Sequence, residues 1–421
     1  MKKKLKKFFR SLGPGFITGA SDDDPSGIAT YSQTGALFGY GQLWLSLYLW
    51  PFMSAIQEMC GRIGLVTGRG LAGVIRAHYH RSILYVAVSL LLIANTVNIG
   101  ADLGAMASAA QLLLNWPFAS WLIVMIALTL LLEVFVSYRV YAKYLKYLTL
   151  ALFAYVAAFF MVRQDWRAIV LATFIPKFSL SSDYLMNIVA ILGTTISPYL
   201  FFWQASEEVE EEVTKHKIRA MGSGIPRVTR RDISALRSDT AIGMLWSQII
   251  AFFIIATTGS TLYLAGMNNI TTATEAAEAL RPLAGNFTFL LFALGIVGTG
   301  LLAVPVLAGS ASYAIAESFG WREGLYRKFA QAHGFYGVIT VATLVGLLIN
   351  FIGLQPFQIL YYTAVLNGMI APPLMVLILL IAGNKKIMGK YINSRRSKAL
   401  GWIITVLMGA ASLALLYDFI W

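Results

Sequence analysis

The sequence predicts an all-α membrane protein, and three observations lead to this fold class. Hydrophobic residues make up 58% of the 421 residues and charged residues only 13%, whereas a soluble domain is about one-quarter charged. Apolar stretches recur along the chain, each near the length that a helix needs to cross a bilayer. Continuous apolar runs such as 120–132 lack the alternation of a membrane β-barrel, and only helices and closed barrels satisfy their backbone groups in lipid.

Eleven membrane-spanning helices are expected in chain order. The first and third stretches are long enough to be broken or tilted. The first also follows a basic start, as a signal peptide does, but Gly13-Pro14 interrupts its apolar region and no small-residue cleavage site follows. It is therefore interpreted as a retained helix. The expected spans are 12–40, 42–62, 82–114, 119–136, 144–162, 187–204, 240–265, 287–314, 334–354, 357–382 and 399–420.

The distribution of basic residues orients these spans. With the amino terminus in the cytoplasm, the inner segments hold 29 of the 33 Lys and Arg residues, and the outer segments hold Arg163, Arg167, Lys177 and Arg281. This asymmetry follows the positive-inside rule. The net charge of +13 therefore indicates contact with a lipid bilayer and not with nucleic acid. The carboxyl terminus is expected outside the cell.

A weak internal repeat is visible in the first and sixth spans. Residues 19–27 (GASDDDPSG) and 193–199 (GTTISPY) interrupt the two apolar stretches with Gly, hydroxyl residues and a Pro. The two spans begin two sets of five, about 12–162 and 187–382, and an odd number of spans per set inverts the second set. Matching helix breaks in inverted halves indicate a transporter site. We expect one transmembrane domain over 1–421, with an extra helix at about 399–420.

Three consecutive carboxylates, Asp22, Asp23 and Asp24, lie in the first break. An ionised carboxylate at mid-bilayer costs about 2.5–3.5 kcal/mol even on lenient scales, and no Lys or Arg lies near these residues in the sequence. Proline frees backbone carbonyls near Ala20–Ser21 and Gly193–Thr194. A multivalent cation would satisfy both the carbonyls and the acids.

The candidate ligands are all oxygen atoms. No Cys, His or Met falls within the two breaks, the single cysteine Cys60 excludes a disulfide or a Cys-based cluster, and the four histidines map to inner loops or span ends. Oxygen ligands favour Mg²⁺, Ca²⁺ and Mn²⁺. We predict metal contacts at Asp24, Ser21, Gly27, Thr194 and Ser197. The predicted pathway or supporting residues are Asp22, Asp23, Ser26, Asn98, Asp102, Tyr199, Gln204, Gln248 and Asn367.

Two interpretations stay open for other polar residues. Asn95, Asn98 and Asp102 on the third span, Gln248 and Asn367 either line the pathway or form polar contacts between helices. The long inner loop, about 205–239, carries an acidic run and then a basic run. Such runs usually form a solvated helix surface, and the alternative is a metal-attracting vestibule or sensor.

At the two breaks the chain resembles the natural resistance-associated macrophage protein (NRAMP) family of divalent-metal transporters. Gly13-Pro14-Gly15 precedes the first break. Asp24-Pro25-Ser26-Gly27 stands where the family has Asp-Pro-Gly-Asn, and residues 194–199 (TTISPY) stand where it has Ala-x-x-Met-Pro-His. The resemblance implies a LeuT-like fold of two inverted five-helix repeats, in which helices 1 and 6 are broken, and one extra helix at the carboxyl end.

The departures from the family pattern imply a different ion. The metal-binding Asp is kept as Asp24, but Gly27 replaces the Asn and Ser197 replaces the Met, so the sulfur ligand is lost. The family's proton pathway is also depleted, since Tyr199 and Gln204 replace histidines. Asp102 is kept, but Ala105 replaces a Glu, and the region of Tyr336-Gly337 replaces a pair of Arg residues. This pattern resembles the NRAMP-related magnesium transporters, a bacterial branch that moves metal without protons.

We therefore predict a non-enzymatic transporter in the bacterial inner membrane that takes up Mg²⁺, and Mn²⁺, by alternating access without proton coupling. The metal is its substrate, no cofactor is expected, and a monomer is the expected state. One alternative is a proton-coupled Mn²⁺/Fe²⁺ transporter of the same family. Another is an amino-acid carrier on the same scaffold, although the acids in the first break would repel a substrate carboxylate. A signalling protein typically has a large soluble domain, and an intramembrane hydrolase needs a nucleophile–His pair or a His-Glu-x-x-His helix. Neither feature is present in the sequence.

Overall fold

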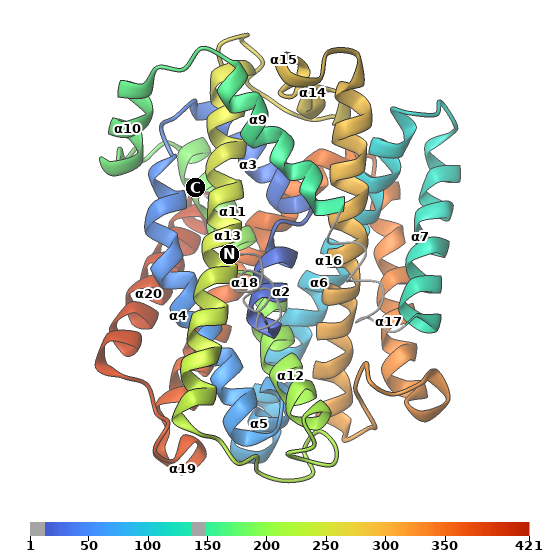
Figure 1. The fold of residues 1–421 in the computed structure, drawn as a ribbon, viewed down its shortest axis with the longest axis vertical. Coiled ribbons are helices and arrows are strands. Elements are labelled where there is room, and N and C mark those ends of the chain that lie inside the picture. Colours follow the sequence, from blue (N-terminus) through green and yellow to red (C-terminus); the bar gives the residue numbers. More distant parts are fainter. Residues whose placement is uncertain (1–12, 137–147, 421) are drawn as a thin grey trace, which may run out of the picture.

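The computed structural model describes residues 13–136 and 148–420, and in these residues the regular structure is helical. Figure 1 shows a bundle in which most long helices run along one axis. Two of the basic segments counted above, 2–10 and 139–146, and the start of the predicted span 144–162 lie outside the described residues. The helices are α2 (Pro14–Asp22), α3 (Pro25–Phe38), α4 (Trp44–Thr67), α5 (Leu71–His78), α6 (Arg81–Gln111), α7 (Phe118–Phe135), α9 (Phe153–Met161), α10 (Trp166–Phe174), α11 (Ser182–Thr195), α12 (Pro198–Thr214), α13 (Arg230–Thr261), α14 (Ala273–Glu278), α15 (Arg281–Ala284), α16 (Thr288–Phe319), α17 (His333–Leu347), α18 (Pro356–Gly383), α19 (Lys385–Met388) and α20 (Arg395–Ile420).

Eight described helical stretches are long and apolar enough to cross a membrane, and each corresponds to a predicted span. They confirm the all-α membrane fold class. The count of eleven stays a prediction, because three predicted spans are not among these stretches. The first is divided into two short helices, the second corresponds to α4, which is long enough but not apolar enough, and the fifth begins outside the described residues. The eight stretches are Arg81–Gln111, Phe118–Phe135, Ser182–Thr214, Arg230–Thr261, Arg281–Phe319, His333–Phe351, Pro356–Gly383 and Arg395–Asp418.

Both predicted helix breaks are present in the structure. α2 ends at Asp22 and α3 begins at Pro25, and α11 ends at Thr195 and α12 begins at Pro198. Proline has no amide hydrogen to donate, and its fixed φ suits the first position of a helix. Each proline therefore starts a new half-helix, and the residues before it stay non-helical.

Close contacts between small residues hold the broken helices against their neighbours. A Cβ atom on Gly19 of α2 would lie 2.2 Å from the carbonyl carbon of Gly243 on α13. A Cβ atom on Gly193 of α11 would lie 2.0 Å from the Ala364 oxygen and 2.2 Å from the Gly368 nitrogen, both on α18. Small residues permit this approach of helix backbones in membrane proteins. The two half-helices that precede the breaks are therefore fixed in the same way.

The two ends of the bundle differ. Figure 1 places α10, α14 and α15 at one end and α5 and α19 at the other. We call the end with α5 and α19 the basic end, because its segments carry the Lys and Arg residues that predict a cytoplasmic location.

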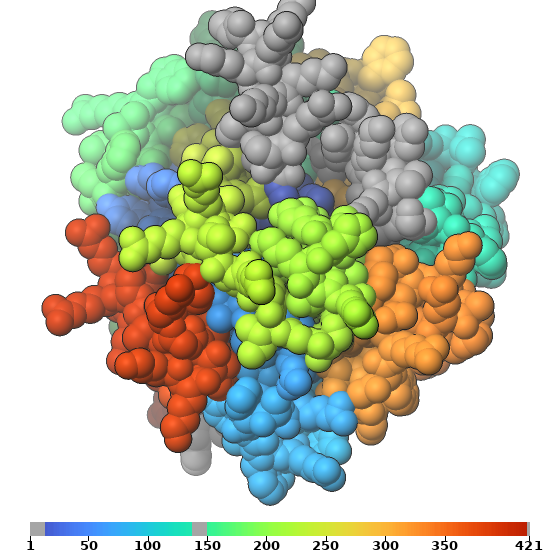
Figure 2. Space-filling model, turned by 60° about the horizontal axis from the view of Figure 1, so that its bottom comes forward, coloured from blue at the N-terminus to red at the C-terminus, as the bar shows by residue number. Residues whose placement is uncertain are grey.

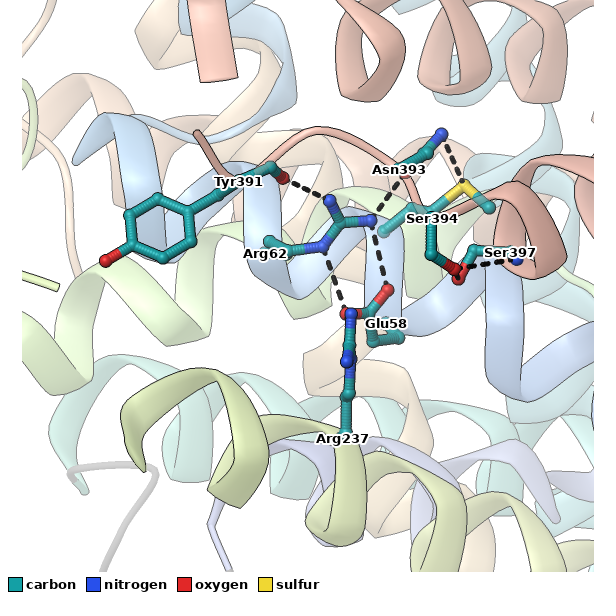
Figure 3. A network of polar contacts seen from close by, with 8 residues as sticks. Glu58, Arg62, Arg237, Tyr391, Asn393, Ser394 and Ser397 are labelled. Carbon is teal, nitrogen blue, oxygen red and sulfur yellow. Dashed lines mark hydrogen bonds and ion pairs between the residues drawn. The ribbon is translucent and has the colours of Figure 1, made fainter. Parts of the chain in front are cut away.

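A buried polar network joins three segments near this basic end (Figure 3). Arg62 of α4 is 1% exposed, and its Nε and Nη2 atoms lie 3.0 and 3.1 Å from the Glu58 carboxylate oxygens. Arg62 also donates to the Tyr391 carbonyl and, at 2.5 Å, to Asn393 Oδ1. Arg237 of α13 donates to the same Glu58 at 3.0 Å. The network therefore ties α4 to α13 and to the connection between α18 and α20.

Candidate metal-binding site

Asp24 lies at the first break, where it caps the amino end of α3. Its Oδ1 atom accepts hydrogen bonds from the Gly27 amide and the Ser26 hydroxyl, both at 2.7 Å. Its Oδ2 atom accepts from Asn98 Nδ2 of α6 at 3.3 Å. The side chain is buried. The capping bonds and the positive end of the helix dipole both favour the ionised carboxylate at this position.

Hydroxyl groups connect the first break to the second. The Ser26 Oγ and Thr194 Oγ1 atoms lie 3.3 Å apart, and the Tyr31 Oη and Thr195 Oγ1 atoms lie 3.2 Å apart. A Cβ atom on Gly27 would lie 3.4 Å from Thr194 Oγ1. The structure therefore brings together five of the sequence-predicted residues, Asp24, Ser26, Gly27, Asn98 and Thr194.

The backbone carbonyls at the breaks have side-chain partners, which the sequence did not predict. Ser197 Oγ lies 2.6 Å from the Gly193 oxygen and 2.8 Å from the Thr194 oxygen. Tyr199 Oη donates to the Ser21 oxygen at 3.2 Å, and Ser21 Oγ donates to the Ile17 oxygen at 2.9 Å. Ser197 and Tyr199 thus satisfy freed backbone carbonyls, whereas Ser21 Oγ bonds a carbonyl within α2. Each carbonyl oxygen keeps a second lone pair that can bind a cation.

The three consecutive carboxylates have different hydrogen-bond partners, since Asp24 bonds with α3 and α6. Asp22 and Asp23 hydrogen-bond with α13, where Ser247 Oγ lies 2.5 Å from Asp22 Oδ2 and 3.2 Å from Asp23 Oδ1. One hydroxyl hydrogen can serve only one of these acceptors at a time. Asp22 Oδ1 is buried without a hydrogen-bond partner among the described residues. Ser247 was not predictable from the sequence, since a lone Ser in an apolar helix carries no signal.

No group of three or more His, Cys, Asp or Glu side chains converges as a metal cage anywhere in 13–136 or 148–420. A cation at Asp24 would therefore be held by one carboxylate with hydroxyl, amide or carbonyl oxygens and with water. Mg²⁺ usually binds proteins in this way, through one or two carboxylates and several retained waters.

The polar residues of α6 differ in their contacts, which bear on whether they line the pathway or form polar contacts between helices. Asn98 contacts Asp24, and its Oδ1 atom has no partner within the described chain. Asp102 lies one turn further along α6, and both of its carboxylate oxygens are buried and likewise without a described partner. Asn95 donates to the Leu307 oxygen at 2.8 Å and to Ser310 Oγ at 2.6 Å on α16. Asn95 therefore forms a contact between helices, whereas Asn98 contacts the candidate ligand Asp24.

The remaining predicted pathway residues lie apart from Asp24, and none hydrogen-bonds to it within the described chain. Gln204 Nε2 donates to Glu208 Oε1 at 2.9 Å on the same helix. Gln248 Nε2 lies 3.2 Å from Met53 Sδ, and Asn367 Nδ2 is buried without a described partner.

The acidic run after the second break differs from the predicted solvated surface. α12 continues to Thr214, so the run is helical, but Glu208, Glu210 and Glu212 are buried. Glu210 accepts from the Tyr313 hydroxyl, and Glu212 Oε1 lies 3.0 Å from Lys217 Nζ. The charge pattern could not show this burial because the covering segments come from distant parts of the chain.

Comparison with known proteins shows the family and supports the fold. A family model described as natural resistance-associated macrophage protein-like matches residues 15–418. A crystal structure of the Eremococcus coleocola manganese transporter, in complex with an aromatic bis-isothiourea substituted compound, is similar with a TM-score of 0.76 and 16% identity, covering 97% of this chain and 86% of that chain. A nucleobase-cation-symport-1 family transporter, in a closed conformation with bromovinylhydantoin bound, has a TM-score of 0.58 and 14% identity, covering 97% of this chain and 90% of that one.

Proposed function

The chain belongs to the natural resistance-associated macrophage protein (Nramp) family of membrane transporters, and on that premise we propose that it carries divalent metal ions, with Mg²⁺ as the preferred substrate and Mn²⁺ as a second. The observation that carries the proposal is Asp24, a buried carboxylate at the point where the two helix breaks meet, whose described partners are hydroxyl and amide groups.

The chemistry of the surrounding atoms supports a hard, hydrated ion. Ser26, Asn98 and Thr194 offer oxygen atoms near Asp24, and oxygen ligands suit Mg²⁺ and Mn²⁺. Gly27 and Ser197 occupy the positions where the family pattern has an amide and a thioether. Small side chains there leave volume for water that Mg²⁺ retains, and the absence of the thioether removes the preference for softer ions. The manganese transporter with the same fold supports a divalent cation as the substrate class.

The architecture supports alternating access around this site. We propose one transmembrane domain over 1–421 with inverted repeats at about 12–162 and 187–382. α3 packs along α13 and α12 packs along α4, which is the pairing expected when the two sets are exchanged. The basic end is proposed to face the cytoplasm of a bacterial cell, with the carboxyl terminus outside, and the monomer is proposed as the transporting unit.

Uptake without protons is consistent with the residues at the positions of the family's proton pathway. These are Tyr199, Gln204, Ala105 and Tyr336, and none of these side chains ordinarily titrates near neutral pH. An inside-negative potential supplies about 4.6 kcal/mol per dication per 100 mV, which is ample for uptake. The metal then follows the electrical gradient.

One observation favours a second candidate, proton-coupled Mn²⁺/Fe²⁺ transport. Asp102 is fully buried, and neither of its carboxylate oxygens has a described partner. A carboxylate is one of the side chains that can accept and release a proton. Amino-acid transport is less well supported, because Asp24 already occupies the amino end of α3, where a substrate carboxylate would bind.

Ion influx into proteoliposomes tests the proposed substrate. Purified protein is reconstituted, and Mg²⁺, Mn²⁺ and Ca²⁺ are added separately, with fluorescent indicators enclosed in the vesicles. The proposal expects saturable Mg²⁺ and Mn²⁺ influx that needs the protein. Mn²⁺ influx with no Mg²⁺ influx would assign the chain to the second candidate, and no divalent flux would refute metal transport.

A further inference from the structure

A large cavity opens at the basic end of the molecule, well separated along the chain from the residues around Asp24. Its volume is about 680 Å³, which is within the range of about 300–1,000 Å³ that is usual for small-molecule sites. Three segments surround it: the junction of α4 and α5, the connection between α12 and α13, and α19 with the residues that follow it. Figure 2 shows this end of the molecule, where the blue, yellow-green and red segments meet.

The cavity wall is basic. Arg69, His78, Lys386 and Lys390 line it, and its lining contains no Asp or Glu. Glu317 is the acid that attracts Arg69. It does not line the cavity, and its two carboxylate oxygens accept the Gly70 and Gly73 amides at 2.5 and 2.8 Å. A concave wall of one charge sign focuses the electrostatic potential and concentrates ions of the opposite charge.

Hydrogen bonds to backbone carbonyls connect the three segments around the cavity. The Gly222 amide donates to the Gly68 oxygen at 2.8 Å, which fixes the α12–α13 connection to the end of α4. The Tyr391 hydroxyl donates to the Val228 oxygen at 2.6 Å, which closes the other side. Gly68 has a positive φ of 66°, and a Cβ atom there would lie 2.5 Å from the Gly224 oxygen. The cavity is therefore a preformed feature of three segments that are distant in sequence.

We propose that this cavity is a binding site for a phosphate-bearing anion, and that the anion regulates transport from the basic end. Lys and Arg side chains are the usual protein groups that bind phosphate oxygens, through charge-assisted hydrogen bonds. The chemistry is shared by two sources, a free nucleotide and the headgroup of an anionic phospholipid, and the volume accommodates either. None of the residues that line the cavity is a proposed metal-binding or pathway residue, so this inference is independent of the proposed substrate.

The position of the cavity links its occupancy to the transporting helices. Tyr391 lines the cavity, and its carbonyl accepts a hydrogen bond from Arg62 in the buried network of Figure 3. That network also contains Arg237 of α13, and α13 packs against both half-helices of the first break. An anion that bridges Arg69 of the α4–α5 junction to Lys386 and Lys390 would hold these segments together and change the rate of transport.

The test uses the full-length protein and two matched double variants. Lys386→Ala/Lys390→Ala removes two exposed positive charges from the cavity wall. Arg395→Ala/Lys398→Ala removes two exposed positive charges at the same end, outside the cavity. A third variant, Ala77→Trp, fills the cavity without changing its charge. Binding of ATP is measured by calorimetry in detergent, and retention of phosphatidylglycerol and cardiolipin is measured by native mass spectrometry.

A result for either source, nucleotide or lipid, supports the proposal if the two cavity variants lose binding and the control double variant keeps it. A nucleotide site predicts that Kd for ATP rises about tenfold or more in the cavity double variant and in Ala77→Trp, and about twofold or less in the control, because direct charge-assisted contacts outweigh general attraction. A lipid site predicts no ATP binding, and loss of retained anionic lipid in the same two variants only. Equal effects in the cavity and control variants, binding of neither probe by the wild-type protein, or a rate of Mg²⁺ influx into proteoliposomes that the bound anion leaves unchanged would each overturn the proposal.

Discussion

The replacement of Asp24 by Asn separates its charge from its structural role. The carboxylate caps α3 through the Gly27 amide and also accepts from Ser26 and Asn98. Asn is as good a helix cap as Asp, and the free Asn98 Oδ1 atom can accept from the new amide. We therefore expect Asp24→Asn to lose metal transport while it keeps the fold.

The magnitudes distinguish this variant from Asp24→Ala. Loss of a cap costs about 0.5–2 kcal/mol, so Asp24→Ala should be destabilised by about 1–2 kcal/mol in the absence of metal. Asp24→Asn removes a buried negative charge, which alone costs about 2.5–3.5 kcal/mol in the membrane interior. Its metal-free form should therefore be at least as stable as the wild-type protein.

The assay is thermal unfolding in detergent, with and without Mg²⁺, combined with flux in proteoliposomes. A ligand at 100 times its Kd stabilises the folded state by about 2.7 kcal/mol, and this gain should vanish in both variants. Asp24→Asn that keeps Mg²⁺-dependent stabilisation, or near-normal Mg²⁺ flux, would remove Asp24 from the site. An Asp24→Asn variant that is unfolded in the absence of metal would contradict the argument that Asn replaces Asp24 as the helix cap.

Three further predictions follow from particular contacts. Gly27→Asn with Ser197→Met restores the amide and thioether of the family pattern, and should shift competition assays toward Mn²⁺ or Cd²⁺ over Mg²⁺; an unchanged Mg²⁺ preference would show that pocket volume outweighs these ligands. Arg62→Met should cost about 3 kcal/mol of stability, because it leaves the buried Glu58 with only part of its network, and a loss below about 1 kcal/mol in denaturation would contradict the buried-pair argument. Burial and neighbouring carboxylates raise the pKa of Glu323 from 4.5 to about 10. A raised acid pKa means that the folded state binds the extra proton, so stability falls as pH rises from 4.5 towards 10. Glu323→Gln should therefore raise Tm by an amount that grows as pH rises from 4.5 towards 10. A gain in Tm that does not depend on pH would refute the raised pKa of Glu323.

The parts of the fold that follow from local sequence were predictable. Pro25 and Pro198 interrupt apolar stretches, and the structure places both at the starts of half-helices. The eight long helices follow the hydropathy pattern for the same reason. A proline or an apolar run acts on its own neighbours, so the signal is contained in the chain segment itself.

The details of the site depend on contacts between distant segments, and these were not predictable. The bonds of Asp22 and Asp23 with Ser247 depend on how α2 packs against α13, and a run of three acids carries no information about the direction of each side chain. The burial of Glu210 under the segment that follows α16 is hidden for the same reason. The contact of Asn95 with Leu307 and Ser310 likewise depends on the position of α16.

Simultaneous measurement of metal influx and internal pH tests the central claim most directly. Proteoliposomes hold a pH-sensitive dye and a metal indicator, and the membrane voltage is set with a potassium gradient and valinomycin. The proposed function predicts Mg²⁺ and Mn²⁺ influx that increases with inside-negative voltage and leaves the internal pH unchanged. Acidification that depends on the metal, persists at clamped voltage and disappears in Asp102→Asn would contradict uncoupled transport and identify Asp102 as the proton carrier.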